Sequence, residues 1–249
     1  MKPLAVKIRN LSFQYPGQSS LCLDNLDLDV KQGERFGLFG PNGAGKTTLM
    51  SLMTGLLSFN EGSLELLGHP VNENKNLINQ FFGFVPQDFS FYHDLSPQEN
   101  LEFFGAWAGL SKKEIKARIV ELLEVLGLTD VRNKQVKKFS GGMKRRVNLA
   151  IGVIHEPKIL FLDEPTVGVD VQTRHAIIDY LLSLNKKGTT LIYTSHQLSE
   201  AESLCETVAL IDQGKIIAEN SLNGLLSEYH EEGLEGLFLN LTGKAYRDH

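Results

Sequence analysis

Gly40-Pro41-Asn42-Gly43-Ala44-Gly45-Lys46-Thr47-Thr48 is the stretch that decides the fold of this chain. It fits the pattern G-x-x-x-x-G-K-[ST], in which glycines let successive backbone N–H groups point at a polyphosphate. The apolar run 35–39 before it predicts a buried strand. The residues after it predict one face of a helix through Leu49, Leu52, Met53 and Leu56. We therefore expect a strand, a phosphate-binding loop and a helix whose positive end faces the same anion. In such a loop Lys46 reaches the outer phosphates and Thr47 ligates magnesium.

Composition sets the outer limits of the interpretation. The chain has 249 residues, 42% of them hydrophobic, which suits one large α/β domain or a domain with a subdomain. Its formal charge of −5 argues against a nucleic-acid binder. Cys22 and Cys205 lack a metal-binding spacing, and we interpret them as buried, reduced residues of a cytosolic protein. No signal peptide is evident, and no apolar run approaches the ~18 residues of a membrane span. Any role at a membrane should therefore depend on a partner.

The N-terminal third predicts a layer of strands that leads into the phosphate loop. Alternating apolar and polar residues indicate an edge strand over 5–15 and a second strand over 21–30. Tyr15, at the end of the first strand, is either a stacking platform for adenine or a half-buried strand aromatic, and periodicity alone favours the second. A further strand at 81–85 ends just before Gln87. Gln87 could reach a ligand, because ligands of open α/β sheets gather at strand carboxyl ends. His69 is expected to be a loop residue.

Residues 89–157 change character and predict helices over 96–109 and 111–126. Ser96-Pro97 and the pair Ser111 and Glu114 are helix-start signals. The aromatic residues of this block either build a small core or line a groove for a partner, and they are Phe89, Phe91, Tyr92, Phe103, Phe104 and Trp107. Basic residues nearby would ordinarily form a solvated face, and they are Lys134, Lys137, Lys138, Lys144, Arg145 and Arg146.

A second anion-binding arrangement lies in the same block. Ser140-Gly141-Gly142 precedes a helix expected over 144–154, so free N–H groups and a positive helix end again face outward. One nucleotide does not need two phosphate cradles from one chain. The redundancy is a clue to how the protein works.

The second half predicts two core strands that end in polar residues. The apolar strand at 158–162 ends at Asp163 and Glu164, which suit magnesium and the activation of a water, respectively. A helix is expected after Asp170 and up to about residue 185, and then a strand at 189–194. His196 comes after that strand and is either structural or able to bond a γ-phosphate or the attacking water. A hairpin over 207–219 and leucines at helical spacing in 221–249 close the chain.

Together these motifs resemble the ATP-binding subunit of ABC transporters along essentially the whole chain. The order matches that family: Tyr15, the Walker A loop Gly40–Thr48, Gln87, the signature Ser140-Gly141-Gly142, Asp163, Glu164, Asp170 and His196. The resemblance implies that Tyr15 is the adenine platform and that Asp170 belongs to the nucleotide site. It also implies that Thr47, Gln87 and Asp163 hold Mg²⁺, and that Glu164, His196 and Gln87 serve catalysis. Phe139 and Met143 depart from the usual leucine and glutamine, which does not put catalysis in doubt.

The resemblance implies an α/β P-loop NTPase of ABC type, with a mixed core sheet, an antiparallel β-layer and an α-helical subdomain. Residues 1–88 and 157–220 would form the RecA-like core, 89–156 the helical signature subdomain, and 221–249 a helical tail. The details look most like the ABC-2 type, drug- and polysaccharide-exporter branch. The stretches that indicate this branch are 143–146, 164–170 and 238–243.

The expected function is ATP hydrolysis that powers an ABC transporter, with ATP and Mg²⁺ as cofactors. Two ATP-binding domains would stack head to tail as a homodimer, so the signature of one chain would serve the ATP of the other. A multi-spanning membrane permease would hold the pair at the cytoplasmic face of the inner membrane. The alternative is a soluble ABC ATPase in DNA repair or translation, although the chain lacks the long coiled-coil insertion or second domain of those relatives. A P-loop kinase or GTPase would not need the signature, and Lys46 and Glu164 disfavour a non-catalytic scaffold.

Overall fold

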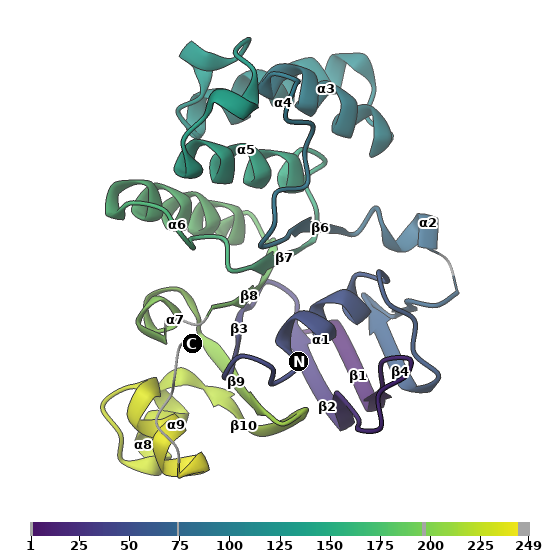
Figure 1. Cartoon of the computed structure of the whole chain (residues 1–249), viewed down its shortest axis with the longest axis vertical. Coiled ribbons are helices and arrows are strands. Elements are labelled where there is room, and N and C mark those ends of the chain that lie inside the picture. The colour runs from purple at the N-terminus through teal and green to yellow at the C-terminus, as the bar shows by residue number, and fades with distance from the viewer. Residues whose placement is uncertain (1, 74, 196–197, 244–249) are drawn as a thin grey trace.

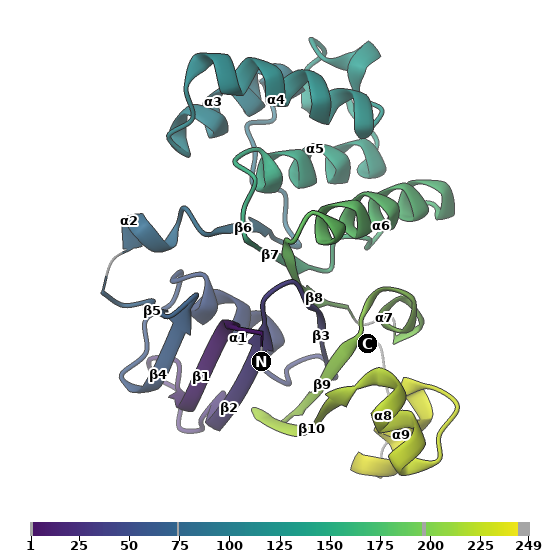
Figure 2. The same cartoon turned by 180° about the vertical axis from the view of Figure 1, so that it is seen from behind.

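The structure is a computed structural model of the chain, and it describes residues 2–73, 75–195 and 198–243. Two sheets lie below a group of three helices (Figures 1 and 2). The larger sheet has the strand order β10-β9-β3-β8-β7-β6, and the smaller one β2-β1-β4-β5. The fold is the mixed α/β arrangement expected, with an antiparallel β-layer beside a largely parallel core.

The core sheet consists of five parallel strands and one antiparallel edge strand. Its strands are β3 (Arg35–Phe39), β6 (Phe82–Val85), β7 (Ile159–Asp163), β8 (Thr190–Thr194), β9 (Thr207–Asp212) and β10 (Lys215–Ser221). Only β10 runs antiparallel, as the second arm of a hairpin with β9. Every residue of β7 and β8 is buried, as in central parallel strands covered on both faces.

The two faces of β7 belong to two different cores. Ile159 and Phe161 pack with helix α1 (Lys46–Met53) and the β-layer, whereas Leu160 and Leu162 pack with the later helices. Alternate residues of a strand point to opposite faces, so one apolar run supplies both cores. The sheet is thereby clamped between the β-layer and the helices. That arrangement fixes where its strand ends lie.

The β-layer contains β1 (Leu4–Phe13), β2 (Leu23–Lys31), β4 (Glu61–Leu66) and β5 (His69–Pro70). The prediction that the first strand is an edge strand is wrong, because β1 pairs with β2 on one side and β4 on the other. Nearly every second residue of β1 is fully buried. His69 lies in the short strand β5 rather than in a loop. Sheet order depends on long-range pairing, which an alternating pattern does not encode.

Three helices form the upper group in Figure 1: α3 (Pro97–Trp107), α4 (Lys112–Val125) and α5 (Gly141–Val153). The predicted caps are confirmed, since Ser96 with Glu99 and Ser111 with Glu114 both form capping boxes. Helix α5 begins three residues earlier than expected. Its first turn contains Gly141 and Gly142, and Ser140 is its N-cap. The Ser140 hydroxyl accepts a bond from the Met143 N–H that offsets the poor helix propensity of two glycines.

The remaining helices are α2 (Lys75–Ile78), α6 (Val171–Lys186), α7 (Leu198–Leu204), α8 (Leu222–Tyr229) and α9 (Leu234–Thr242). The last two lie beside β10 in both views (Figures 1 and 2). Leu56 lies beyond the end of α1 and is 67% exposed, so it is not part of the buried helix face that was expected. Within the described part of the chain, no helix combines the length and apolar character needed to cross a bilayer.

Candidate nucleotide-binding and hydrolysis site

The phosphate loop connects β3 to α1 at the carboxyl end of the core sheet. Gly43 and Gly45 have φ angles of +81° and +109°, which side chains rarely tolerate, and Gly45 is the N-cap of α1. A Cβ at Gly40 would lie 2.0 Å from the carbonyl oxygen of Ile211 in β9. Glycine is therefore required at Gly40 by close packing and at the other two positions by backbone conformation. The loop is built by these two constraints.

Lys46 is buried, and its ammonium group donates to the carbonyl oxygens of Gly40 (2.6 Å) and Pro41 (3.1 Å). The lysine thus curls back along its own loop. This places a positive charge beside the backbone N–H groups of the helix start, so the loop suits a polyanion.

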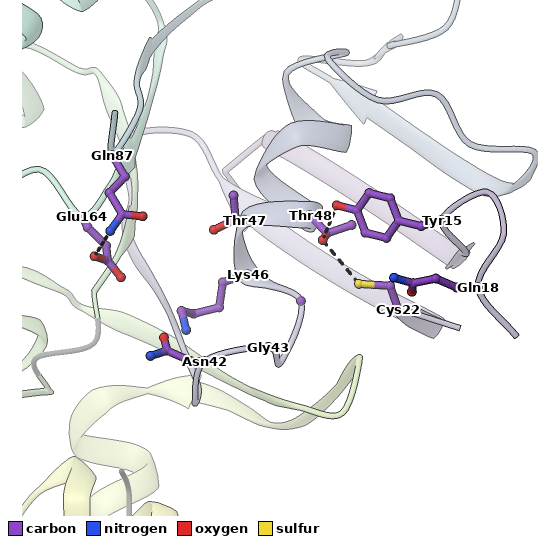
Figure 3. Close-up of a pocket in the computed structure, with 11 residues that line it drawn as sticks. Tyr15, Gln18, Cys22, Asn42, Gly43, Lys46, Thr47, Thr48, Gln87 and Glu164 are labelled. Atoms are coloured by element: carbon purple, nitrogen blue, oxygen red, sulfur yellow. Dashed lines mark hydrogen bonds between the residues drawn. The ribbon is translucent and has the colours of Figure 1, made fainter. Parts of the chain in front are cut away.

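A cavity of about 670 Å³ opens above this loop. Its lining combines the loop with residues from three other segments: Tyr15, Gln18, Cys22, Asn42, Gly43, Gly45, Lys46, Thr47, Thr48, Gln87 and Glu164. In Figure 3, Gln87 and Glu164 lie on one side, Tyr15, Gln18 and Cys22 on the other, and Lys46 between them. This volume suits a small-molecule ligand of nucleotide size.

Two acidic residues follow β7, and the structure gives them different surroundings. Asp163 is 3% exposed, and its Oδ1 accepts a 2.5 Å bond from the Thr194 hydroxyl. Burial raises the pKa of Asp163, and the nearby Glu164 charge raises it further, while Thr194, Thr47 and Lys46 oppose the shift. A carboxylate in such a place is stabilised by a cation. The donor set therefore fits a magnesium ion.

Glu164 has a positive φ of 50°, which is uncommon for a residue with a side chain. Its N–H donates to the Thr194 carbonyl (3.1 Å), and its Oε2 accepts from the Gln87 amide at 3.0 Å. Gln87 comes from the end of β6, and two strands, β8 and β7, lie between β6 and the strand β3 that leads into the phosphate loop. The turned backbone thus points the Glu164 carboxylate into the cavity, where a water could lose a proton to it.

Tyr15 lies at the opposite end of the cavity. Its ring packs edge-on against Phe13 (centroids 4.9 Å apart), and its phenol oxygen is 3.0 Å from the Thr48 hydroxyl. The half-buried ring faces the cavity, an orientation that fits a stacking platform.

The signature residues do not line this cavity. Gly141 is exposed, and a Cβ on Gly142 would contact the side chain of Thr173 in α6. Asp170 caps α6 and accepts bonds from the N–H and hydroxyl of Thr173, both 2.8 Å. These bonds, the backbone one first, lower the pKa of Asp170. The starts of α5 and α6 therefore meet at a separate surface, away from the chain's own phosphate loop. His196 lies outside the described residues.

Three residues were missed or misjudged from sequence. Cys22 is half-buried rather than buried, and it lines the cavity together with Gln18. Arg145 was expected on a solvated face but is 5% exposed. A signal existed for Arg145, because it shares a helix face with the buried Asn148, Leu149 and Gly152 at spacings of three, four and seven. No pattern in the sequence indicated Cys22 or Gln18.

The fold and this site define a P-loop nucleotide-binding protein. Comparison with known proteins narrows the class. A model of the family described as "ABC transporter" matches residues 23–167. The linearmycin resistance ATP-binding protein LnrL of Bacillus subtilis is 42% identical over 221 residues, covering 89% of this chain and 71% of that protein. A Nod factor export ATP-binding protein I of Cupriavidus metallidurans is 41% identical, covering 91% of this chain and 78% of that protein.

Solved structures that resemble this chain also belong to ABC transporters or are ATP-binding cassettes. One described as the ATP binding subunit of an ABC transporter has a TM-score of 0.88 at 26% identity, covering 96% of this chain and 99% of its own. A dimeric, post-hydrolysis structure of the ATP-binding cassette MJ0796 bound to ADP and Pi has a TM-score of 0.80 at 27% identity, covering 87% and 98%. The chain belongs to the ABC transporter family. Within that family it is an ATP-binding subunit that hydrolyses ATP, and the relatives do not support a role in DNA repair or translation.

Proposed function

We propose that this subunit powers an ABC-2 type exporter, as one of two identical ATP-binding subunits held by a multi-spanning permease at the cytoplasmic face of the cell membrane. Its relatives are named for linearmycin resistance, Nod factor export and daunorubicin resistance. The cargo would be chosen by the permease. The observation that carries the proposal is the opposition of Lys46 to the Gln87–Glu164 pair across one cavity.

The nucleotide site would divide its work among the residues that surround the cavity. Tyr15 would stack on the base, and the backbone of 40–48 with Lys46 would hold the phosphates. Glu164 would accept a proton from a water, oriented by Gln87 and His196. Asp170 would close the site from the neighbouring chain.

A magnesium ion would be held by Thr47, Asp163 and Gln87. Among the described residues, no group of three or more His, Cys, Asp and Glu side chains could hold a metal without other donors. The protein would thus offer a partial ligand set, which phosphate oxygens complete. When bound, the ion neutralises negative charge on the phosphates.

Dimer formation would account for the separation between the cavity and the signature. Ser140, Gly141 and Gly142 start α5 at a surface outside the cavity, so their N–H groups are available to another chain. Two copies stacked head to tail would each lend a signature to the other's ATP. The relative MJ0796 is described as dimeric with ADP and Pi.

Three exposed aromatic side chains support permease docking on the helical group. Trp107 is 73% exposed, Tyr92 50% and Phe103 45%, and the rings of Tyr92 and Phe103 meet edge-on at 4.9 Å. Phe89, Phe91 and Phe104 instead pack into or against the core. The six aromatics therefore divide between a core and an exposed surface. We propose that residues 89–156 move as one unit, and that this surface passes the motion to the permease.

The test compares a variant that should bind ATP without hydrolysing it with a control variant that should bind ATP poorly. Glu164→Gln should bind ATP, lose nearly all hydrolysis and accumulate as an ATP-bound dimer in size-exclusion chromatography. Lys46→Ala should bind ATP weakly and stay monomeric, which shows that dimerisation requires bound nucleotide. Hydrolysis by Glu164→Gln at the wild-type rate would remove Glu164 from its role. Purification from detergent extracts should bring down a multi-spanning membrane protein, and recovery without one would count against the transporter assignment.

A further inference from the structure

Arg145 is a buried charge whose hydrogen bonds go to backbone carbonyl oxygens. It lies one turn into α5, and its Nη1 donates to the carbonyl oxygens of Gln87 (2.7 Å) and Pro86 (3.3 Å). Its guanidinium carbon lies 4.9 Å from the centroid of the Phe89 ring. All three contacts fall on the segment 86–89 that follows β6. Arg145 thus holds the backbone around Gln87 in place through these contacts.

Asn148, three residues further along α5, holds the same segment. Its Nδ2 donates to the Pro86 carbonyl (3.1 Å), and its Oδ1 accepts from the Ser90 N–H (3.3 Å). Residues at i and i+3 lie on one helix face, so Arg145 and Asn148 act from the same side. Together they bond backbone groups of Pro86, Gln87 and Ser90.

The segment held in this way carries a site residue. The side-chain amide of Gln87 donates to Glu164 at 3.0 Å, while the carbonyl of the same residue accepts from Arg145 at 2.7 Å. The Gln87 backbone is therefore fixed by α5, and its side chain reaches the catalytic carboxylate. The contacts form a continuous path from α5 to Glu164.

A contribution to fold stability does not by itself explain why Arg145 is buried at this position. Burial lowers the pKa of Arg145, and the charges of Glu164 and Asp88 only partly offset that cost. Its Nε is also buried without a hydrogen-bond partner in the described part of the chain. A buried charge of this kind stabilises a fold less than an apolar side chain of similar volume would, but a rigid guanidinium fork fixes geometry well.

We propose that Arg145 is a positioning residue for ATP hydrolysis: it fixes the Gln87 backbone so that the Gln87 amide holds Glu164 in place. This rests on the role proposed above for Glu164. Because α5 begins at the signature residues Ser140 to Gly142, the same helix would connect the surface that meets the second subunit to the chain's own catalytic carboxylate.

A matched pair of variants tests the position rather than the residue type. Arg145→Lys keeps the charge but loses the planar guanidinium, whose Nη1 makes the bonds to Gln87 and Pro86 and which lies over the Phe89 ring. Its neighbour Arg146 also donates to a backbone carbonyl, but that of Leu126 (3.0 Å) at the end of α4. We expect Arg145→Lys to lower kcat about tenfold with little change in the KM for ATP, since small misplacements of catalytic groups are costly. Arg146→Lys should leave both constants near wild type.

A double-mutant cycle then asks whether the effect passes through Gln87. In a Gln87→Ala background, Arg145→Lys should cause little further loss of kcat, because the amide that it positions is gone. An equal loss in both backgrounds, or a loss as large for Arg146→Lys, would overturn the proposal.

Asn148→Ala removes the other half of the grip and keeps the test decisive if Arg145→Lys fails to fold. It should lower kcat about threefold by itself, a smaller misplacement, and have no further effect with Gln87→Ala. If Arg145→Lys hydrolyses ATP at the wild-type rate while Glu164→Gln remains inactive, the positioning proposal fails and the proposed function stands. Full hydrolysis by Glu164→Gln would instead overturn the proposed role of Glu164 itself.

Discussion

The phenol oxygen of Tyr15 lies 3.0 Å from the hydroxyl of Thr48, which joins the end of the β-layer to the first turn of the phosphate-loop helix. Cys22 also donates to that hydroxyl, with its Sγ 3.3 Å away. The Tyr15 end of the cavity and the phosphate-loop helix are therefore connected through one threonine. These contacts fix the Tyr15 ring at the edge of the cavity, as Figure 3 shows.

Removing the Tyr15 ring should weaken ATP binding more than removing its hydroxyl. A stacked base is worth about 1–3 kcal/mol, so Tyr15→Ala should weaken ATP binding by roughly ten- to a hundredfold. Tyr15→Phe keeps the ring and loses only the bond to Thr48, so its loss should be within a few-fold. Titration calorimetry with the Glu164→Gln protein gives both affinities without turnover. Equal affinities for Tyr15→Ala and wild type would rule out the ring as a platform.

Cys22 should serve as a native labelling site whose reactivity reports on nucleotide binding. It lines the cavity, whereas Cys205 is buried and its burial raises the pKa of that thiol well above its ordinary value. A maleimide should therefore modify Cys22 and spare Cys205. ATP should slow that reaction in the wild type but not in Lys46→Ala. Peptide mass mapping identifies the modified thiol, and labelling at an unchanged rate in saturating ATP would place the nucleotide elsewhere.

At neutral pH, the buried carboxylate of Asp163 should lower the free energy of unfolding of the nucleotide-free protein. Folding raises its pKa above the ordinary 3.8, so the folded state binds the proton more tightly than the unfolded state. Stability from this group is then present at low pH and is lost as the pH rises above 3.8 through the folded pKa. Without nucleotide or magnesium, Asp163→Asn should be more stable than wild type at pH 7, by on the order of 1 kcal/mol.

The difference should shrink as the pH falls, which denaturant unfolding at several pH values can follow. Asp94 provides the control because its pKa moves the other way. Its bond with Lys137 lowers that pKa, so Asp94→Asn should bring no gain. A gain from Asp163→Asn that stays constant down to acid pH would contradict the assigned cause.

The capping box of α4 should contribute measurably to stability. The Ser111 hydroxyl accepts from the Glu114 N–H, and the Glu114 carboxylate accepts from the Ser111 N–H. Ser111→Ala should lower the free energy of unfolding by about 1 kcal/mol, as for other N-caps. Lys112→Ala, at an exposed neighbouring position, should change it little. Thermal unfolding of both variants measures the difference, and equal melting temperatures would dismiss the cap as a stabilising feature.

Much of the fold followed from local chemistry. A stretch of a few residues is enough to recognise the two capping boxes, the apolar strands β7 and β8 and the glycines of the phosphate loop. Other features depended on partners far away in sequence. The central place of β1 comes from pairing with β4, and the exposure of Leu56 from where α1 ends. Local patterns contain neither fact.

The sequence by itself determined the loop at 40–48, the acidic pair after β7 and the order of the motifs, because each requires particular residue types at fixed spacing. Only the tertiary structure decided that Cys22 lines the cavity, that Gln87 bonds Glu164, and that Arg145 grips the Gln87 backbone. The physical reason is that a buried polar group is satisfied by whatever donor or acceptor the packing brings to it. For Gln87 and Arg145 those partners lie 77 and 58 residues away along the chain.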